Sequence, residues 1–80
     1  MKISRYSSVQ KELQESLRQA RIDAGLRQVD LAKLLDKPQS FVSKYESGER
    51  LLDLLELRQV CIALNISLSK FVEKFEDQIK

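Results

Sequence analysis

The chain has 80 residues, of which 42% are hydrophobic and 32% are charged, and its formal net charge is +2. A chain of this size buries one modest core, so we expect a single domain over residues 1–80. It has no histidine, one cysteine and no apolar run of membrane-spanning length, which excludes an intramolecular disulfide and favours a cytoplasmic protein without a membrane partner.

Nothing in the sequence is typical of an active site. The lone cysteine has no imidazole partner for activation. There is no glycine-rich phosphate loop and no cluster with metal-ligand spacing. We therefore predict no enzyme, no cofactor and no metal. The charge is uneven, because residues 1–50 hold 10 Lys and Arg against 7 Asp and Glu, whereas residues 51–80 hold 4 against 5.

The first predicted helix covers residues 8–24, after a loose leader at residues 1–6. Ser7 is a candidate N-cap, and Gln10 lies at the capping-box position. Gly25 follows the helix and supplies its stop. Apolar residues three and four positions apart mark the expected buried face. They are Val9, Leu13, Leu17, Ala20 and Ala24.

The central stretch, residues 28–47, indicates two short helices joined by a tight turn. Leu31, Leu34 and Leu35 repeat at helical spacing in the first helix. Asp36 tolerates the left-handed conformation that ends a helix, and Pro38 suits the first turn of the next. Val42 and Tyr45 then face inward. The other face gathers the polar residues Gln39, Ser40, Ser43, Lys44 and Ser47.

Two further helices are predicted after Gly48, which permits a positive-φ turn. Asp53 caps the first of them, with Glu56 at the capping-box position, and Ser67 caps the second. The first carries Leu54, Leu57, Val60, Cys61 and Leu64, with Cys61 as a small buried hydrophobe. The second carries the apolar stripe Phe71, Val72, Phe75 and Ile79. The fold class is therefore all-α, a compact five-helix bundle.

The central stretch resembles the Cro/repressor-type (XRE-type) helix-turn-helix family. The resemblance rests on the order Gln28, Leu31-Ala32, Leu35, Ser40, Val42-Ser43, Glu46, Gly48 and Arg50. It runs from about Leu13 to Phe75 and implies a lambda-repressor-like DNA-binding domain. Two positions depart from the family pattern. The turn is Asp36-Lys37-Pro38 instead of Gly-apolar-Ser, and Arg27 stands where Ser or Thr is usual.

The polar face of the second central helix is the candidate DNA reader. A helix fits the major groove, where base edges present distinct donors and acceptors. Gln39 can pair with adenine, Lys44 can donate to guanine, and Ser40 can bond several bases. The resemblance implies that these three positions contact bases. The alternative is an ordinary solvated helix face.

Other residues are candidates for the DNA backbone. Gln28 opens the first central helix, where free backbone N–H groups can meet a phosphate, and the family uses the matching position as a phosphate clamp. Further candidates are Ser43, Arg50, Arg27 and Lys37. For each surface Arg or Lys, the alternative to a phosphate contact is that the charge only keeps the protein soluble. Phe41 either touches a thymine methyl group or closes the core beside Pro38.

The resemblance also implies a structural ion pair. An Arg late in the first helix, here Arg21, often pairs in the family with the Glu that ends the recognition helix, here Glu46. Such a pair would fix the angle of the recognition helix. The alternative is that the two residues lie on the surface and do not pair.

The C-terminal stripe admits two interpretations. Phe71, Val72, Phe75 and Ile79 could all pack on the neighbouring helices, or part of the stripe could form a two-fold dimer interface. We predict a sequence-specific transcription regulator, a repressor or controller, that binds a short pseudo-palindromic double-stranded DNA operator as a homodimer. The alternative is a protein-interaction module or antitoxin-type adaptor with a protein partner, which the mild net charge favours.

Overall fold

The computed structural model describes residues 7–79 and contains, within them, five α-helices and no strand. The helices are α1 (Ser8–Asp23), α2 (Gln28–Leu35), α3 (Gln39–Ser47), α4 (Leu54–Ala63) and α5 (Leu68–Gln78). The predicted all-α five-helix fold is thereby confirmed, while the predicted leader at residues 1–6 lies outside the described residues. No helix in the described part combines the length and apolar character that a membrane crossing requires.

Side-chain caps begin three of the helices at the predicted residues. Ser7 Oγ accepts a hydrogen bond from the backbone N–H of Gln10 at 3.1 Å at the start of α1. Asp53 and Glu56 form a reciprocal capping box at α4, with bonds of 2.7 and 3.0 Å. Ser67 caps α5. Because each cap satisfies N–H groups that the helix leaves free, local sequence suffices to place these helix starts.

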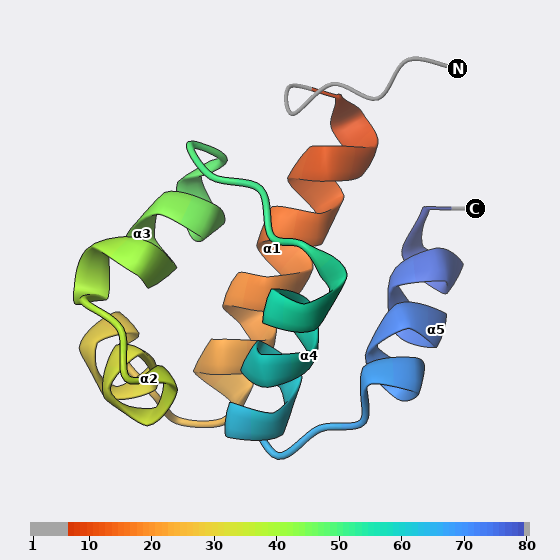
Figure 1. The fold of residues 1–80 in the computed structure, drawn as a ribbon. Helices are drawn as coiled ribbons and strands as arrows, with labels where there is room; N and C mark the ends of the chain where they lie inside the picture. The colour runs from red at the N-terminus through yellow and green to blue at the C-terminus, as the bar shows by residue number, and fades with distance from the viewer. Residues whose placement is uncertain (1–6, 80) are drawn as a thin grey trace.

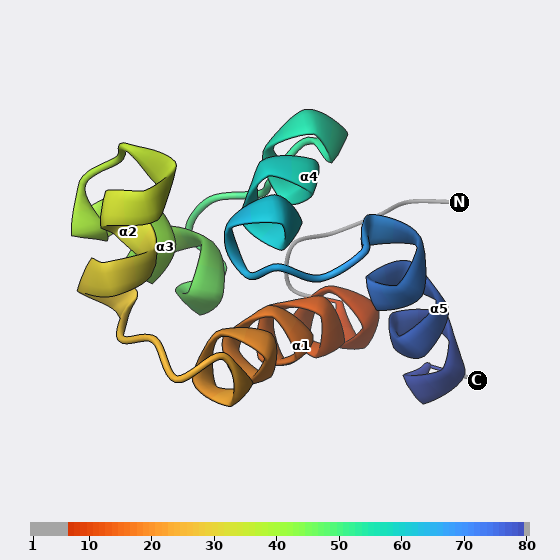
Figure 2. The same cartoon turned by 90° about the horizontal axis from the view of Figure 1, so that it is seen from below.

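The helices form two groups on either side of a central pair. In Figure 1, α2 and α3 lie to the left, α5 lies to the right, and α4 passes in front of α1 between them; Figure 2 shows the same order from below. Helix α1 packs against α3 and α5, and α4 packs against α2 and α5. The outer side of α3 therefore has no other helix over it.

The core lies where α1, α2, α3 and α4 meet, with one residue from α5. It consists of Leu17, Leu31, Ala32, Val42, Tyr45, Val60, Cys61, Leu64 and Phe71. Cys61 is buried, as predicted, and burial raises the pKa of its thiol. Such a thiol is poorly nucleophilic, so Cys61 serves as a packing residue.

Two residues that were predicted on the buried face of α1 are exposed. Val9 is 49% exposed, and Ala24 is exposed as well. Val9 belongs to the first turns of α1, which project beyond the other helices in Figure 1. Ala24 lies in the turn after the helix. Helical period placed both positions on this face, but packing among the described residues leaves both of them exposed.

Two glycines end elements in the left-handed conformation and allow a matched stability test. Gly25 has φ +75° with open space around an added Cβ, whereas at Gly48, with φ +88°, an added Cβ would lie 2.6 Å from the Gln14 amide nitrogen. The Gln14 side chain can swing away, so backbone strain should dominate at both sites. We expect Gly25→Ala and Gly48→Ala each to lower the free energy of unfolding by about 1 kcal/mol, measured by urea denaturation.

The close approach to Gln14 should add only a small amount. In the double variant Gln14→Ala, Gly48→Ala the cost of the glycine replacement should stay near that of Gly25→Ala. A Gly48→Ala cost that disappears when Gln14 is truncated would show that steric contact, and not the positive φ, makes glycine necessary there.

Candidate nucleic-acid interface

The polar face of α3 is free of packing. Gln39, Ser40, Ser43 and Lys44 are all exposed, while Val42 and Tyr45 on the opposite face are 0% and 2% exposed. In the described part of the chain the side chains of Ser40, Ser43 and Lys44 make no hydrogen bond or ion pair. The helix therefore presents an unobstructed row of donors and acceptors beside a side anchored in the core.

The turn between α2 and α3 forms despite its departure from the family pattern. Asp36 ends α2 in the left-handed conformation, with φ 56° and ψ 45°. The N–H of Lys37 donates to the Ala32 carbonyl at 3.0 Å, which closes the turn. Pro38 then stands at the N-cap of α3 in an extended conformation. Aspartate thus takes the place of glycine because its short side chain tolerates positive φ.

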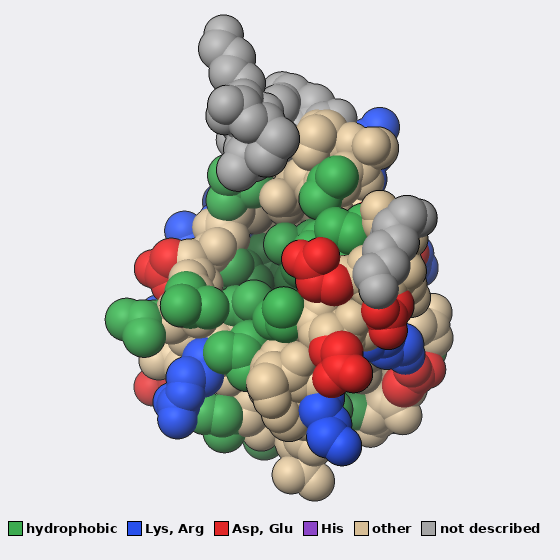
Figure 3. All heavy atoms as spheres, turned by 90° about the vertical axis from the view of Figure 1, so that its right-hand side faces the viewer, with side chains coloured by type: hydrophobic (Ala, Val, Ile, Leu, Met, Phe, Trp, Pro, Cys, Tyr) green, Lys and Arg blue, Asp and Glu red, His purple; other side chains and the backbone are tan. Residues whose placement is uncertain are grey.

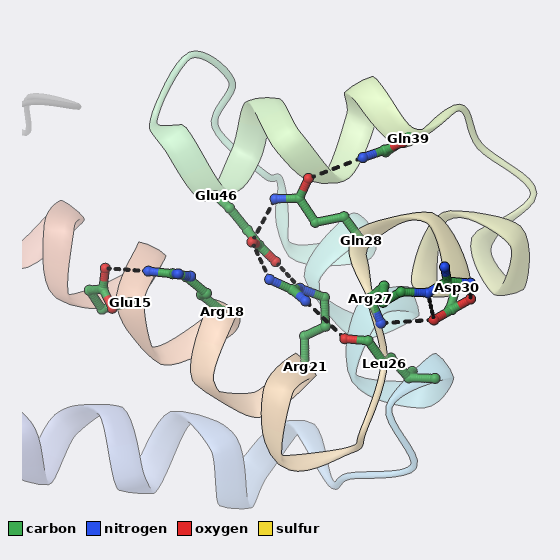
Figure 4. Close-up of polar contacts among 9 residues, drawn as sticks. All are labelled: Glu15, Arg18, Arg21, Leu26, Arg27, Gln28, Asp30, Gln39 and Glu46. Carbon is green, nitrogen blue, oxygen red and sulfur yellow. Dashed lines mark hydrogen bonds and ion pairs between the residues drawn. The ribbon is translucent and has the colours of Figure 1, made fainter.

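A nearly buried ion pair ties the end of α3 to α1. Arg21 Nε donates to Glu46 Oε2 at 2.8 Å, and its Nη2 donates to Glu46 Oε1 at 3.1 Å (Figure 4). The two side chains are 10% and 4% exposed. Arg21 Nη1 also donates to the Leu26 carbonyl at 2.8 Å. The hydrogen bonds to Glu46 raise the pKa of Arg21, so the pair stays charged.

Gln28 extends this pair to the start of the recognition helix. Its amide nitrogen donates to Glu46 Oε1 at 3.1 Å, and its amide oxygen faces the Gln39 amide nitrogen at 3.5 Å (Figure 4). The second contact is long and weak. The Glu46 carboxylate thus orients the Gln28 amide, and one amide hydrogen of Gln28 is left for a further acceptor.

Arg27, a predicted backbone contact, is held by a carboxylate of its own helix. The Asp30 carboxylate accepts from the backbone N–H, Nε and Nη2 of Arg27, each at 2.9 Å (Figure 4). The bonds to the Arg27 side chain, more than any other cause, lower the pKa of Asp30 to about 2. Asp30 is therefore charged at neutral pH, and Arg27 reaches a phosphate only by exchanging one anionic partner for another.

Arg50 is held in a similar way, beside an aromatic ring. Its guanidinium pairs with Glu56 and lies 5.0 Å from the centre of the Phe41 ring, and Lys37 Nζ lies 5.7 Å from the same ring. Phe41 packs edge-on against Tyr45 at 5.6 Å and contacts the core. Of the two roles considered for Phe41, the structure supports core closure, with the ring as a platform that holds two cations.

The predicted site residues thus fall into two groups. Gln39, Ser40 and Lys44 project from one exposed helix face, whereas Arg27 and Arg50 are each paired with an acid. Sequence reasoning missed both of these partners. Asp30 follows Arg27 by three positions, which is a recognisable helical spacing. Glu56 comes from the next helix start, and its pairing with Arg50 depends on how the intervening loop folds.

The stripe on α5 is largely used within the chain. Phe71 is 8% exposed and belongs to the core, and Phe75 and Ile79 are half-buried. Phe71 and Phe75 line a groove of about 550 Å³ between α1 and α5. Of the four predicted dimer residues, Val72 has the most exposed position, at 38%. Phe71 is therefore unavailable to a dimer interface, because α1 and α4 already cover it.

The comparisons with known proteins agree with this geometry. A protein-family pattern described as helix-turn-helix matches residues 17–71. An XRE-family-like protein from Pseudomonas syringae pv. tomato is 36% identical in sequence and superposes with a TM-score of 0.84, over 91% of this chain and 89% of that one. The chain belongs to the XRE-type helix-turn-helix family.

Two further solved structures share the XRE-type fold. A single-residue variant of the restriction-modification controller protein C.Esp1396I is 25% identical, with a TM-score of 0.83 over 91% of this chain and 92% of that one. The clp gene regulator ClgR from Corynebacterium glutamicum is 24% identical, with a TM-score of 0.77 over 89% and 91% of the two chains, and shows likeness of fold alone. No curated protein matches the sequence significantly.

The buried ion pair generates the first prediction about this interface. Arg21→Met keeps the length of the side chain but leaves the Glu46 carboxylate buried with only Gln28 as a partner. We expect the free energy of unfolding at pH 7 to fall by about 3 kcal/mol. The loss should come from the uncompensated buried charge, so the deficit relative to wild type should shrink at acidic pH, where a carboxylate takes up a proton and becomes neutral.

Arg18→Met is the matched control, since Arg18 lies one turn earlier on α1. Its side chain is 55% exposed and meets Glu15 only at 3.9 Å, so its replacement should change stability by less than about 0.5 kcal/mol. Urea denaturation of both variants and of the wild type, at pH 7 and at acidic pH, measures these changes in the free energy of unfolding. A deficit in Arg21→Met that is independent of pH would contradict a role for the Glu46 charge.

Proposed function

We propose that this chain is a sequence-specific DNA-binding transcription regulator whose helix α3 reads the major groove. The observation that carries the proposal is the free polar face of α3. Gln39, Ser40 and Lys44 are exposed there, side by side, on a helix held rigidly from behind by the Arg21–Glu46 pair. Membership of the XRE-type family supports the same assignment.

The contacts divide into readers and anchors. Gln39 and Lys44 carry the donor and acceptor patterns that suit adenine and guanine edges, and Ser40 adds a short donor between them. Gln28 and Ser43 meet phosphates directly, and Arg27, Lys37 and Arg50 supply positive charge at the margins. Phosphate contacts hold the protein in register, whereas base contacts carry the sequence preference.

The regulator binds as a homodimer to a pseudo-palindromic operator. Two copies related by a two-fold axis would place their recognition helices about 34 Å apart, one turn of B-DNA. Occupation of promoter DNA suffices for a repressor or controller, and the chain requires neither a cofactor nor an enzymatic step for it. A protein with this role works in the cytoplasm, where bacterial DNA is found.

A protein-interaction module or antitoxin-type adaptor is the second candidate. The mild net charge of +2 and the internal pairing of Arg27 and Arg50 favour it. Salt dependence separates the two functions. DNA affinity should fall steeply with salt because phosphate neutralisation releases counterions, whereas a protein contact need not respond in this way.

Selection of bound duplexes from a randomised DNA pool, followed by sequencing, tests the function. An inverted repeat with half-sites about one helical turn apart is the expected result. A single enriched half-site would keep the DNA assignment and remove the dimer. The absence of any enrichment, from a protein shown to be folded by circular dichroism, would remove the DNA assignment and favour the interaction module.

Substitutions should separate readers from anchors. Lys44→Ala should relax the preference at one base position by about 1–3 kcal/mol, because that base loses its donor. Arg50→Ala should weaken binding to all sequences alike and reduce the salt slope by about one charge. Fluorescence anisotropy with the selected operator and its single-base variants measures both effects.

Lys70→Ala serves as the control because it removes an equal charge from α5, on the opposite side of the bundle from α3. The DNA affinity and base preference of Lys70→Ala should match those of the wild type. If Lys44→Ala and Arg50→Ala also kept wild-type affinity and selectivity, then the α3 face would be the wrong surface.

A further inference from the structure

The groove between α1 and α5 lies apart from the α3 face, and none of its lining residues is a proposed DNA contact. Its volume of about 550 Å³ falls within the range of small-molecule sites in proteins, roughly 300–1,000 Å³. The apolar part of its lining comes from α1, the end of α4, the following turn and α5. These residues are Ala20, Leu64, Ile66, Phe71 and Phe75. The groove therefore offers an apolar molecule a surface that includes two aromatic rings.

The groove is bounded at both ends, which limits the size of an occupant. Helices α1 and α5 run antiparallel along it (Figure 1). At one end the Ser16 hydroxyl donates to the side-chain oxygen of Gln78 at 2.8 Å and joins the two helices. At the other end the turn at residues 64–67 connects α4 to α5 and lines the groove. A compact molecule fits between these two boundaries, whereas an extended peptide or a helix would have to cross one of them.

Two lysines lie on the α5 side of the groove. Lys70 and Lys74 are about one helical turn apart and share that side with Phe71 and Phe75. The ion pairs among the described residues are all formed by arginines, so neither lysine has an acidic partner there. Both lysines are exposed. Each ammonium group therefore keeps its three donors for another molecule.

Lys70 lies where a positive charge does not stabilise its own helix. It is the third residue of α5, and the first turn of this helix contains no acidic residue. The N-terminal end of a helix carries a partial positive charge, so a lysine there adds repulsion, whereas an anion there is attracted. The charge of Lys70 therefore favours a bound anion at this end of the groove more than it favours the fold.

The positive charge of α5 is confined to the groove. The helix also contains Glu73, Glu76 and Asp77, so two lysines against three acids give it a formal charge of −1. Helical period places Glu73 and Glu76 away from the side that meets α1. Figure 3 looks onto the side of the molecule where α5 lies and shows acidic and basic side chains interspersed there. A polyanion such as DNA would meet this mixed surface, whereas a small anion in the groove lies beside the two lysines.

One acidic residue lies on the α1 side of the groove. Asp23 is exposed and accepts a hydrogen bond from the Gln19 side-chain amide at 2.8 Å. With Asp23 opposite Lys70 and Lys74, the charged lining residues sum to +1. An anionic group is therefore expected on the lysine side, away from the Asp23 carboxylate.

We propose that this groove binds a small organic anion, whose apolar body covers Phe71 and Phe75 and whose carboxylate, sulfonate or phosphate group lies beside Lys70 and Lys74. Removal of the apolar body from water supplies affinity. The two ammonium groups select for negative charge, because a neutral molecule of the same shape gains nothing from them. The site extends the chemistry of the chain beyond DNA, since it shares no residue with the α3 face.

A matched pair of fluorescent probes tests the site. Anilinonaphthalene sulfonate has an aromatic body and an anionic group, and N-phenylnaphthylamine has the same body without the sulfonate. Fluorescence titration of the wild-type chain, shown to be folded by circular dichroism, should give saturable binding of one sulfonate probe per chain. The sulfonate probe should bind at least about fivefold tighter than the neutral probe, the effect of one favourable charge contact.

Charge variants locate the anionic group. Lys74→Ala should weaken binding of the sulfonate probe about fivefold and leave the neutral probe unchanged, because only the sulfonate uses the ammonium group. Asp23→Asn should tighten binding of the sulfonate probe, since it removes the opposing negative charge. Lys33→Ala is the matched control, because Lys33 is an exposed residue of α2 outside the groove. It loses the same charge as Lys74→Ala and should bind both probes as the wild type does.

Three results would overturn the inference. The first is a folded wild type that binds the sulfonate probe without saturation, and the second is equal affinity for the two probes. The third is a loss in Lys33→Ala as large as that in Lys74→Ala, which would show general attraction of the anion to a positive surface. The titration contains no DNA, so each of these results leaves the operator function intact. A chain that binds the sulfonate probe but no duplex would refute the DNA function alone.

Discussion

The buried pair between Arg21 and Glu46 is the interaction on which the rest of this structure depends. Two charges withdrawn from water cost several kcal/mol each, and only a nearly complete set of hydrogen bonds offsets that cost. Here the guanidinium bonds both the Glu46 carboxylate and the Leu26 carbonyl, and the carboxylate also accepts from Gln28. These bonds join α1, the loop before α2, α2 itself and the end of α3. They fix the angle at which the recognition helix stands out from the bundle.

Ion pairs within the chain also determine how charged side chains are arranged around α3. Arg27 and Arg50 are each neutralised by a carboxylate within the chain, and Lys37 and Arg50 lie over the Phe41 ring. The long cations are thus held in defined positions, whereas the side chains of Ser40, Ser43 and Lys44 on α3 have no hydrogen-bond or ion-pair partner among the described residues. The formal net charge of the chain is only +2, so the overall positive field around it is weak.

Helix α4 has two contrasting sides. One side of it completes the core with Val60 and Cys61, and the other carries Leu55 and Ile62 into solvent. An eighty-residue chain cannot bury every apolar residue that its helices contain.

The sequence by itself determined the elements that depend on local physics. The helix starts at Ser7, Asp53 and Ser67 follow from side chains that bond the first free N–H groups, and the turn at Asp36 follows from tolerance of positive φ. The inward face of α3 follows from helical period. The resemblance added the partners Arg21 and Glu46, which lie 25 positions apart and which no local pattern would join.

Tertiary structure decided which apolar and charged residues are covered. Helical period cannot tell whether a neighbouring helix reaches a given turn, so Val9 and Ala24 were predicted on the buried face of α1 although both are exposed. The sequence left open whether Phe71 packs within the chain or forms a dimer interface, and the structure places it in the core. The Arg50–Glu56 contact likewise depends on the path of the loop between them. Side-chain burial and ion pairing depend on how the helices pack against one another. The sequence pattern predicts only which face of each helix is apolar and can therefore be packed.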